Sequence, residues 1–122
     1  TGDTRESPAI YICKWLLEEK AKIAIYDPKA KENAKMELAG VEGSIEYCDC
    51  PYEAAKDAHA IAIITDWKEF KSYDYKKIFD KMEKPAFVFD GRNILDHKGL
   101  FEIGYSVYPL GKPELSHLDD GN

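Results

Sequence analysis

Hydrophobic positions along the 122-residue chain alternate between helical spacing and short runs typical of buried strands. Ile10, Cys13 and Leu17 lie at helical spacing after Ser7-Pro8, a typical N-cap followed by a first-turn proline. Apolar runs bounded by Gly, Pro or Asp follow, separated by further helical stretches. We expect strands at residues 22–26, 44–48, 60–65, 85–89 and 104–108, with helices at 9–19, 29–38 and 74–82 and shorter ones beginning at Pro51 and passing through Leu100.

This alternation predicts an α/β fold, a Rossmann-like three-layer parallel sheet with helices on both faces. Such a fold has a strand before its first helix, and the sequence shows none, so we expect the first strand to be missing from this chain. In a doubly wound sheet of order 3-2-1-4-5-6 that strand is central. Its absence should separate the strands at 22–26 and 44–48 from those at 60–65, 85–89 and 104–108.

The stretch Pro85–Asn93 carries the first candidate functional residue. Ala86 to Phe89 form an apolar run too short for a helix, and Asp90-Gly91 ends it, which predicts a strand buried on both faces. The run at 60–65 is the most apolar and is expected at the centre of the sheet. Arg92 follows at a carboxyl end, where a parallel sheet collects phosphate or carboxylate ligands. The alternative is that Arg92 only pairs with a surface acid.

The segment Thr1–Glu6 would form the first βα loop, just before a helix N-terminus whose free N–H groups favour an anion. Arg5 in this loop should then face the same rim of the sheet as Arg92. Two arginines beside a helix N-terminus would suit a pyrophosphate. A coincidence of surface charges is the alternative.

Composition narrows the class of function. The net charge of −6 and the lack of a dense Lys/Arg cluster argue against nonspecific nucleic-acid binding. No apolar run is long enough to span a bilayer, and the first residues do not resemble a signal sequence, so a cytoplasmic protein is expected. With 44% hydrophobic residues a single compact domain is expected over residues 1–110, and the polar residues 111–122 are predicted to be a mobile tail.

The three cysteines do not predict a metal or catalytic site. Cys48-x-Cys50 lacks the two-residue spacing of typical zinc ligands, and only His59 lies nearby. Cys13 has no His close in sequence to activate it and belongs to the apolar face of its helix. We therefore expect reduced thiols and no metal.

Several segments together resemble the C-terminal, UDP-binding domain of the UDP-glucose/GDP-mannose dehydrogenase family. Their sequences resemble most the UDP-glucose 6-dehydrogenases of that family. The match covers nearly the whole chain in the family's order. The segments are Thr1 to Pro8, Tyr26-Asp27-Pro28, Pro51-Tyr52-Glu53-Ala54, Thr65-Asp66-Trp67 with Phe70, and Phe87 to Arg92.

The resemblance implies part of an NAD-dependent oxidation of UDP-glucose to UDP-glucuronate that uses two NAD molecules. By this resemblance Arg92 matches the arginine that contacts the nucleotide sugar, and Arg5 matches one that reaches NAD held by another domain. The family's catalytic cysteine segment and its Gly-x-Gly-x-x-Gly cofactor loop are absent, so this chain is not expected to catalyse the reaction alone. Its partners would be UDP-glucose or UDP-glucuronate and the rest of a homo-oligomeric dehydrogenase. The alternative is a noncatalytic nucleotide-sugar-binding or assembly module of the same fold.

Overall fold

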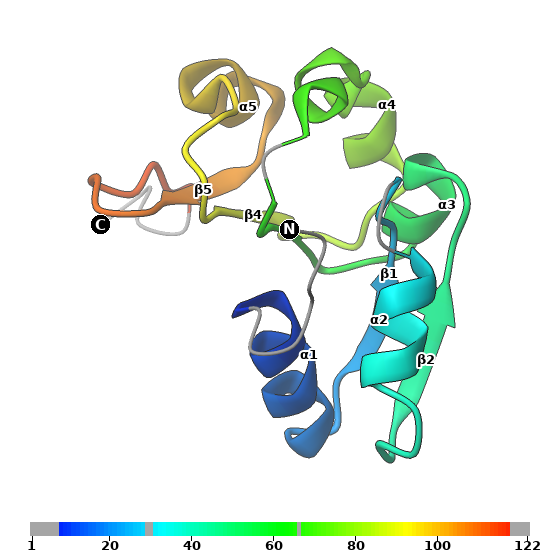
Figure 1. The fold of residues 1–122 in the computed structure, drawn as a ribbon. Coiled ribbons are helices and arrows are strands. Elements are labelled where there is room, and N and C mark those ends of the chain that lie inside the picture. Colours follow the sequence, from blue (N-terminus) through cyan, green and yellow to red (C-terminus); the bar gives the residue numbers. More distant parts are fainter. Residues whose placement is uncertain (1–7, 29–30, 66, 118–122) are drawn as a thin grey trace. The chain divides into compact units, whose positions relative to one another are not determined.

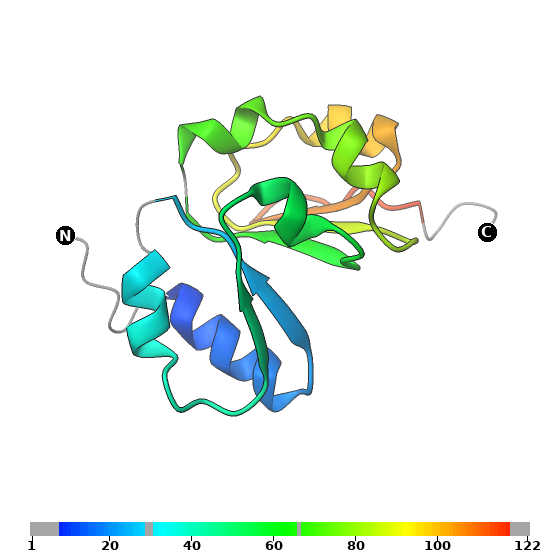
Figure 2. The ribbon, with the colours of Figure 1, turned by 90° about the vertical axis from the view of Figure 1, so that its right-hand side faces the viewer.

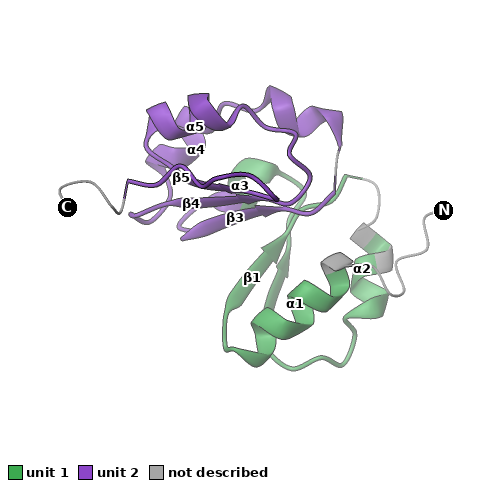
Figure 3. Cartoon of the chain, turned by 90° about the vertical axis from the view of Figure 1, so that its left-hand side faces the viewer, with its two compact units in different colours: residues 1–54 green, residues 55–122 purple. Residues whose placement is uncertain are grey.

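The structure, a computed structural model, describes residues 8–28, 31–65 and 67–117. The chain divides into two compact units, Thr1–Ala54 and Ala55–Asn122, shown in green and purple in Figure 3. The described strands form two parallel sheets, one of order β1-β2 and one of order β3-β4-β5. The predicted α/β, Rossmann-like class with parallel strands is thus confirmed, as is the predicted division of the strands into two groups.

The first unit is a two-stranded parallel sheet packed against two helices. Strands β1 and β2 pair in register from Lys22 opposite Ser44 to Ile25 opposite Tyr47. A small core joins the helices to this sheet, and Cys13 packs against it as an apolar side chain, as predicted. Its elements are α1 (Pro8–Glu18), β1 (Lys22–Ile25), α2 (Lys31–Glu37) and β2 (Ser44–Tyr47), and α3 (Pro51–Ala55) follows at the boundary between the units.

The second unit is a three-stranded parallel sheet with β4 at its centre. Helices α4 and α5 lie on the same face of this sheet (Figures 1 and 2). Val88 and Val107 lie opposite each other on β4 and β5 and are fully buried. The elements are β3 (Ala60–Ile63), the 3₁₀ helix η1 (Lys68–Ser72), α4 (Tyr75–Asp80), β4 (Phe87–Asp90), α5 (His97–Ile103) and β5 (Ser106–Pro109).

Helices α4 and α5 are short, and each begins at a capping carboxylate. Asp74 accepts a hydrogen bond from the N–H of Lys77 at the start of α4, and Asp96 accepts one from the N–H of Gly99 at the start of α5. These caps satisfy N–H groups that have no partner within the helix. Among the described residues, none of the helices combines the length and the apolar character needed to cross a membrane.

Two expectations about the strands were wrong. Strand β4 was predicted to be buried on both faces, but Phe89 is 45% exposed while Val88 is fully buried, so the described residues cover the Phe89 face of β4 only in part. On the other face Phe89 stacks on both Phe87 and Tyr108, while the rings of Phe87 and Tyr108 are tilted against each other. The run at 60–65 was expected at the centre of the sheet, but among the described residues β3 is an edge strand that pairs only with β4.

The segment after β5 is attached to the sheet. The backbone N–H and C=O of Leu115 both pair with Val107, which forms an antiparallel bridge on the outer edge of β5. The ring of His117 stacks on Phe101 with centroids 4.0 Å apart. Residues 118–122 lie outside the described residues, so the predicted mobility of residues 111–122 stays a prediction, as does the single domain predicted for residues 1–110.

Candidate functional site

The candidate site is the loop that follows β4, the central strand of the second unit. Asp90 is the last residue of β4 and is fully buried. The N–H of Gly91 donates a hydrogen bond of 2.9 Å to the carbonyl of Ile63 at the end of β3. A Cβ atom at Gly91 would lie 3.1 Å from that carbonyl oxygen, closer than ordinary van der Waals contact. Glycine therefore lets the loop turn close beside the neighbouring strand, and Arg92 follows at the carboxyl end of the sheet.

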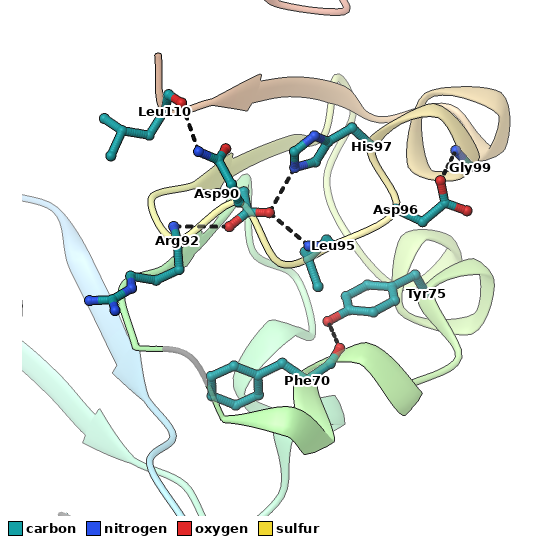
Figure 4. A network of polar contacts seen from close by, with 10 residues as sticks. Phe70, Tyr75, Asp90, Arg92, Leu95, Asp96, His97, Gly99 and Leu110 are labelled. Carbon is teal, nitrogen blue, oxygen red and sulfur yellow. Dashed lines mark hydrogen bonds and ion pairs between the residues drawn. The ribbon is translucent and has the colours of Figure 1, made fainter. Parts of the chain in front are cut away.

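The carboxylate of Asp90 fixes this loop from inside. Its Oδ1 accepts a hydrogen bond of 3.1 Å from the N–H of Arg92, and its Oδ2 accepts one of 2.9 Å from the N–H of Leu95. Nε2 of His97, the first residue of α5, lies 2.8 Å from the same Oδ2. Figure 4 shows these three contacts meeting at one carboxylate. Two oxygens thus accept three donors, and the loop is tied to the start of α5.

These contacts decide the charge of Asp90. Burial favours the neutral acid and by itself would raise the pKa of Asp90. The hydrogen bonds from the Leu95 N–H, from His97 and from the Arg92 N–H favour the carboxylate and outweigh burial, so the pKa of Asp90 lies below its ordinary value. Asp90 is therefore an ionised, hydrogen-bonded group at neutral pH.

A second set of contacts ties the loop to the end of β5. The N–H of Leu110 donates to the carbonyl of Asp90 at 3.1 Å, and the side-chain amide of Asn93 donates to the carbonyl of Leu110 at 2.8 Å. Asn93 has a φ of 56°, in the left-handed region that asparagine adopts more readily than most residues. Strand β4, strand β5 and the loop are thus joined at one end of the sheet.

Arg92 contributes its backbone to this network, while its side chain is exposed and extends away from Asp90 (Figure 4). The guanidinium group of an arginine can donate two parallel hydrogen bonds to a phosphate or carboxylate. Arg5, the other predicted arginine, lies outside the described residues. The predicted pairing of the two arginines therefore stays a prediction.

A cavity of about 440 Å³ lies between η1, α4 and the start of α5. Two lysines, Lys71 and Lys76, are among its lining residues, and Lys76 forms an exposed ion pair of 2.8 Å with Asp80. Arg92 does not line this cavity. The cavity nevertheless adjoins the Arg92 loop, because Leu95, at the end of that loop, lines it.

Two of the cysteines, Cys13 and Cys48, are held as thiols that react poorly. Burial raises the pKa of the Cys13 thiol. Burial, together with nearby acidic residues, also raises the pKa of Cys48. A raised pKa reduces the fraction of reactive thiolate. All three cysteines are free thiols, and within residues 8–28, 31–65 and 67–117 no group of three or more His, Cys, Asp or Glu side chains could hold a metal ion.

The sequence indicated Arg92 but not the residues that fix its loop. Asp90 was interpreted only as the end of a strand, although an Asp that accepts a hydrogen bond from the N–H two residues later is a common turn signal. That signal could have identified the contact with Arg92. The contact of His97 with Asp90 depends on where α5 begins relative to β4, and no local pattern encodes this.

Comparisons with known proteins bear on this site. A family model described as the UDP-glucose/GDP-mannose dehydrogenase family, UDP binding domain, matches residues 1–97, a segment that includes Asp90, Arg92 and His97. The chain is 45% identical to UDP-glucose 6-dehydrogenase 1 of Arabidopsis thaliana, over 98% of this chain and 29% of that protein. It is 48% identical to UDP-glucose 6-dehydrogenase 2 of the same species, over 98% of this chain and 28% of that protein. It is 46% identical to UDP-glucose 6-dehydrogenase 3 of Oryza sativa subsp. japonica, over 98% of this chain and 29% of that protein. The chain spans less than a third of the length of these relatives.

Proposed function

Because the chain belongs to the UDP-glucose/GDP-mannose dehydrogenase family, as its UDP-binding domain, we propose that it supplies the UDP-sugar site of an NAD-dependent UDP-glucose 6-dehydrogenase. The parent enzyme would oxidise UDP-glucose to UDP-glucuronate and reduce two NAD molecules. The proposed setting is the cytoplasm, and the free thiols of the three cysteines support a reducing compartment. The parent is proposed to be a homo-oligomer.

The position of Arg92 is the observation that carries this proposal. Arg92 lies at the carboxyl end of the central strand of a parallel sheet, in a loop whose backbone is fixed by Asp90. Ligands of open α/β sheets bind at this edge. Because the loop is already fixed, less conformational entropy is lost when a ligand binds. The positive charge of Arg92 suits an anionic ligand such as a diphosphate.

Catalysis itself is assigned to other parts of the parent chain. None of Cys13, Cys48 and Cys50 lies in the family's catalytic cysteine segment, and the sequence has no Gly-x-Gly-x-x-Gly loop for NAD. We propose Arg5 as the one contribution of this chain to NAD binding. The chain would therefore bind the nucleotide sugar, while the nucleophile and most of the NAD site lie elsewhere in the enzyme.

Replacement of Arg92 by alanine in the full-length enzyme tests the proposal. Loss of a charge-assisted contact to a phosphate or sugar oxygen should weaken UDP binding by about 2 kcal/mol, which is about 30-fold in Kd. Isothermal titration of UDP against the wild-type and Arg92→Ala enzymes measures this change. NAD binding should not change, because Arg92 is assigned to the nucleotide sugar.

Lys112→Ala provides a matched control. Lys112 is an exposed cation shortly after β5, so its loss removes the same charge from the same edge of the sheet. We expect its UDP affinity to stay within about twofold of the wild type, as for an exposed charge outside a binding site. Equal UDP affinities for the Arg92→Ala and wild-type enzymes would remove Arg92 from the site.

A further inference from the structure

The side chain of Asp90 controls the backbone of Arg92 rather than its guanidinium group. Asp90 accepts from the N–H of Arg92 at one oxygen and from the N–H of Leu95 at the other, so the carboxylate holds both ends of a four-residue segment. The Arg92 side chain extends away from these contacts (Figure 4). The direction in which it leaves the loop therefore depends on a peptide group that Asp90 fixes.

His97 completes this arrangement from the start of α5. Because an ionised carboxylate only accepts hydrogen bonds, Nε2 of His97 must be the atom that carries the donated proton. The His97 side chain is only 15% exposed, so water has little access to this contact. His97 and Leu95 share one oxygen of Asp90, which leaves the other oxygen for Arg92.

We propose that Asp90 and His97 are positioning residues for the nucleotide-sugar site, which act by fixing the backbone of Arg92 and thereby aiming its guanidinium group at the ligand. This inference rests on the proposed role of Arg92 in binding a UDP-sugar. Neither Asp90 nor His97 touches the ligand in this arrangement. Their effect on binding passes through Arg92, and that dependence can be measured.

An Asp90→Asn substitution disturbs this arrangement while the size of the side chain stays almost the same. An amide offers one acceptor oxygen, whereas the carboxylate offers two, and its NH₂ group is a donor. If the amide oxygen stays with Leu95 and His97, the NH₂ group faces the N–H of Arg92, and two donors then oppose each other. If the amide is reversed, the contact with Leu95 is lost instead. In either orientation the loop loses a contact that fixes it.

A double-mutant cycle in the full-length enzyme tests the dependence on Arg92. Asp90→Asn should raise the Kd for UDP about tenfold in the wild-type background, because small displacements of a positioned group are costly. In the Arg92→Ala background the same substitution should change the Kd by less than about twofold, since no guanidinium remains to be positioned. The same factor in both backgrounds would overturn the inference.

His97 supplies a second route if the Asp90→Asn enzyme does not fold. His97→Leu keeps an apolar side chain of similar size and removes the donor, whereas His97→Gln keeps an N–H donor close to the position of Nε2. We expect His97→Leu to weaken UDP binding by about threefold or more and His97→Gln to restore most of the affinity. Equal UDP affinities for His97→Leu and the wild type would overturn the role of His97.

Asp96→Ala is the control for a purely structural effect. It removes the N-cap of α5 one residue before His97 and should cost about 1 kcal/mol of stability without touching the Asp90 contacts. We expect a lower melting temperature and a UDP Kd within about twofold of the wild type.

The measurements separate failure of the proposed function from failure of the positioning role. An Arg92→Ala enzyme with an unchanged Kd for UDP would refute the proposed function. An Arg92→Ala enzyme that binds UDP more weakly, together with an Asp90→Asn enzyme that binds UDP as tightly as the wild type, would refute only the positioning role.

Discussion

At the scale of single residues, Asp90 is a charge buried inside its unit. Such a charge is unfavourable unless hydrogen bonds replace the water that it loses. Here two backbone N–H groups and His97 surround the carboxylate, and its pKa is lower than usual. Asp90 thus stabilises the native loop in its ionised form, and this contribution must depend on pH.

We predict that the stabilisation by Asp90 is lost at acid pH. Its pKa is lower in the folded than in the unfolded chain, so the contribution is fully present above the ordinary Asp pKa of about 4. It is lost as the pH falls through the lower, folded-state pKa. The difference in melting temperature between the wild-type and Asp90→Asn enzymes should therefore be largest at pH 7 and shrink steadily as the pH falls below about 4. A difference that stays constant from pH 7 to pH 3 would contradict this assignment of charge.

Sequence reasoning reached only part of this site. The position of Arg92 in a loop at the carboxyl end of a strand could be predicted, because a Gly-Arg pair directly follows a short apolar run, while its role in binding stays a proposal. The buried state of Asp90 could not be predicted, because a polar residue at a strand end is normally taken as the start of an exposed loop. Its burial depends on donors from Leu95 and His97, which the fold brings together.

At the scale of elements, the junction between α5 and β5 is closely packed. Gly104 ends α5 with a φ of 135°, a conformation that other residues rarely adopt. A Cβ atom there would lie 2.5 Å from Cζ of Phe79, whose ring packs edge-to-face on Tyr105 with centroids 5.0 Å apart. Tyr105 is fully buried and donates a hydrogen bond to the carbonyl of Tyr75. This junction therefore joins α4, α5 and β5.

We predict that Gly104→Ala destabilises the protein more than Gly111→Ala. Gly111 has a φ of 72°, near the left-handed helical region, so its substitution should cost about 1–2 kcal/mol in backbone strain, and Gly104, with a φ of 135°, should cost at least as much. A Cβ atom at Gly111 would meet nothing within 4 Å, whereas one at Gly104 would also displace the Phe79 ring, at a further cost of about 1–3 kcal/mol. Chemical unfolding of the two variants measures the difference. Equal losses of stability would show that Phe79 moves aside without cost.

The order and type of most elements could be predicted from hydrophobic spacing, since each strand is a short apolar run bounded by turn residues. The exposed face of β4 could not be predicted. A continuous apolar run looks the same whether helices cover both faces or, as with Phe87 and Phe89, aromatic rings stack on one of them. The bridge between Leu115 and Val107 was also missed, because a single pairing leaves no periodic signal.

At the scale of the whole molecule, the described strands form two sheets, one of order β1-β2 and one of order β3-β4-β5, and no hydrogen-bonded strand pair among the described residues joins them. Within the described part of the chain, β3 pairs on one side only, with β4, and β1 pairs only with β2. Unpaired strand edges lower stability and favour aggregation.

We predict that a longer chain, extended by about ten residues of the parent enzyme before Thr1, melts at a markedly higher temperature than the 122-residue chain. The added strand would supply hydrogen-bond partners for strand edges that have none among the described strands. Thermal unfolding followed by circular dichroism, with light scattering to detect aggregation, makes the comparison. Cooperative melting of the shorter chain as a monomer, at the same midpoint, would mean that the strand is not central.

The most direct measurement of the UDP-sugar site is a crystal structure of the full-length enzyme with UDP bound. We expect the Arg92 guanidinium to donate to a phosphate or sugar oxygen at about 2.7–2.9 Å, with the Arg92 N–H still bonded to Asp90. The ligand should lie at the carboxyl end of β4. A UDP molecule bound elsewhere, with Arg92 paired to a surface carboxylate, would contradict the assignment of this loop to the nucleotide sugar.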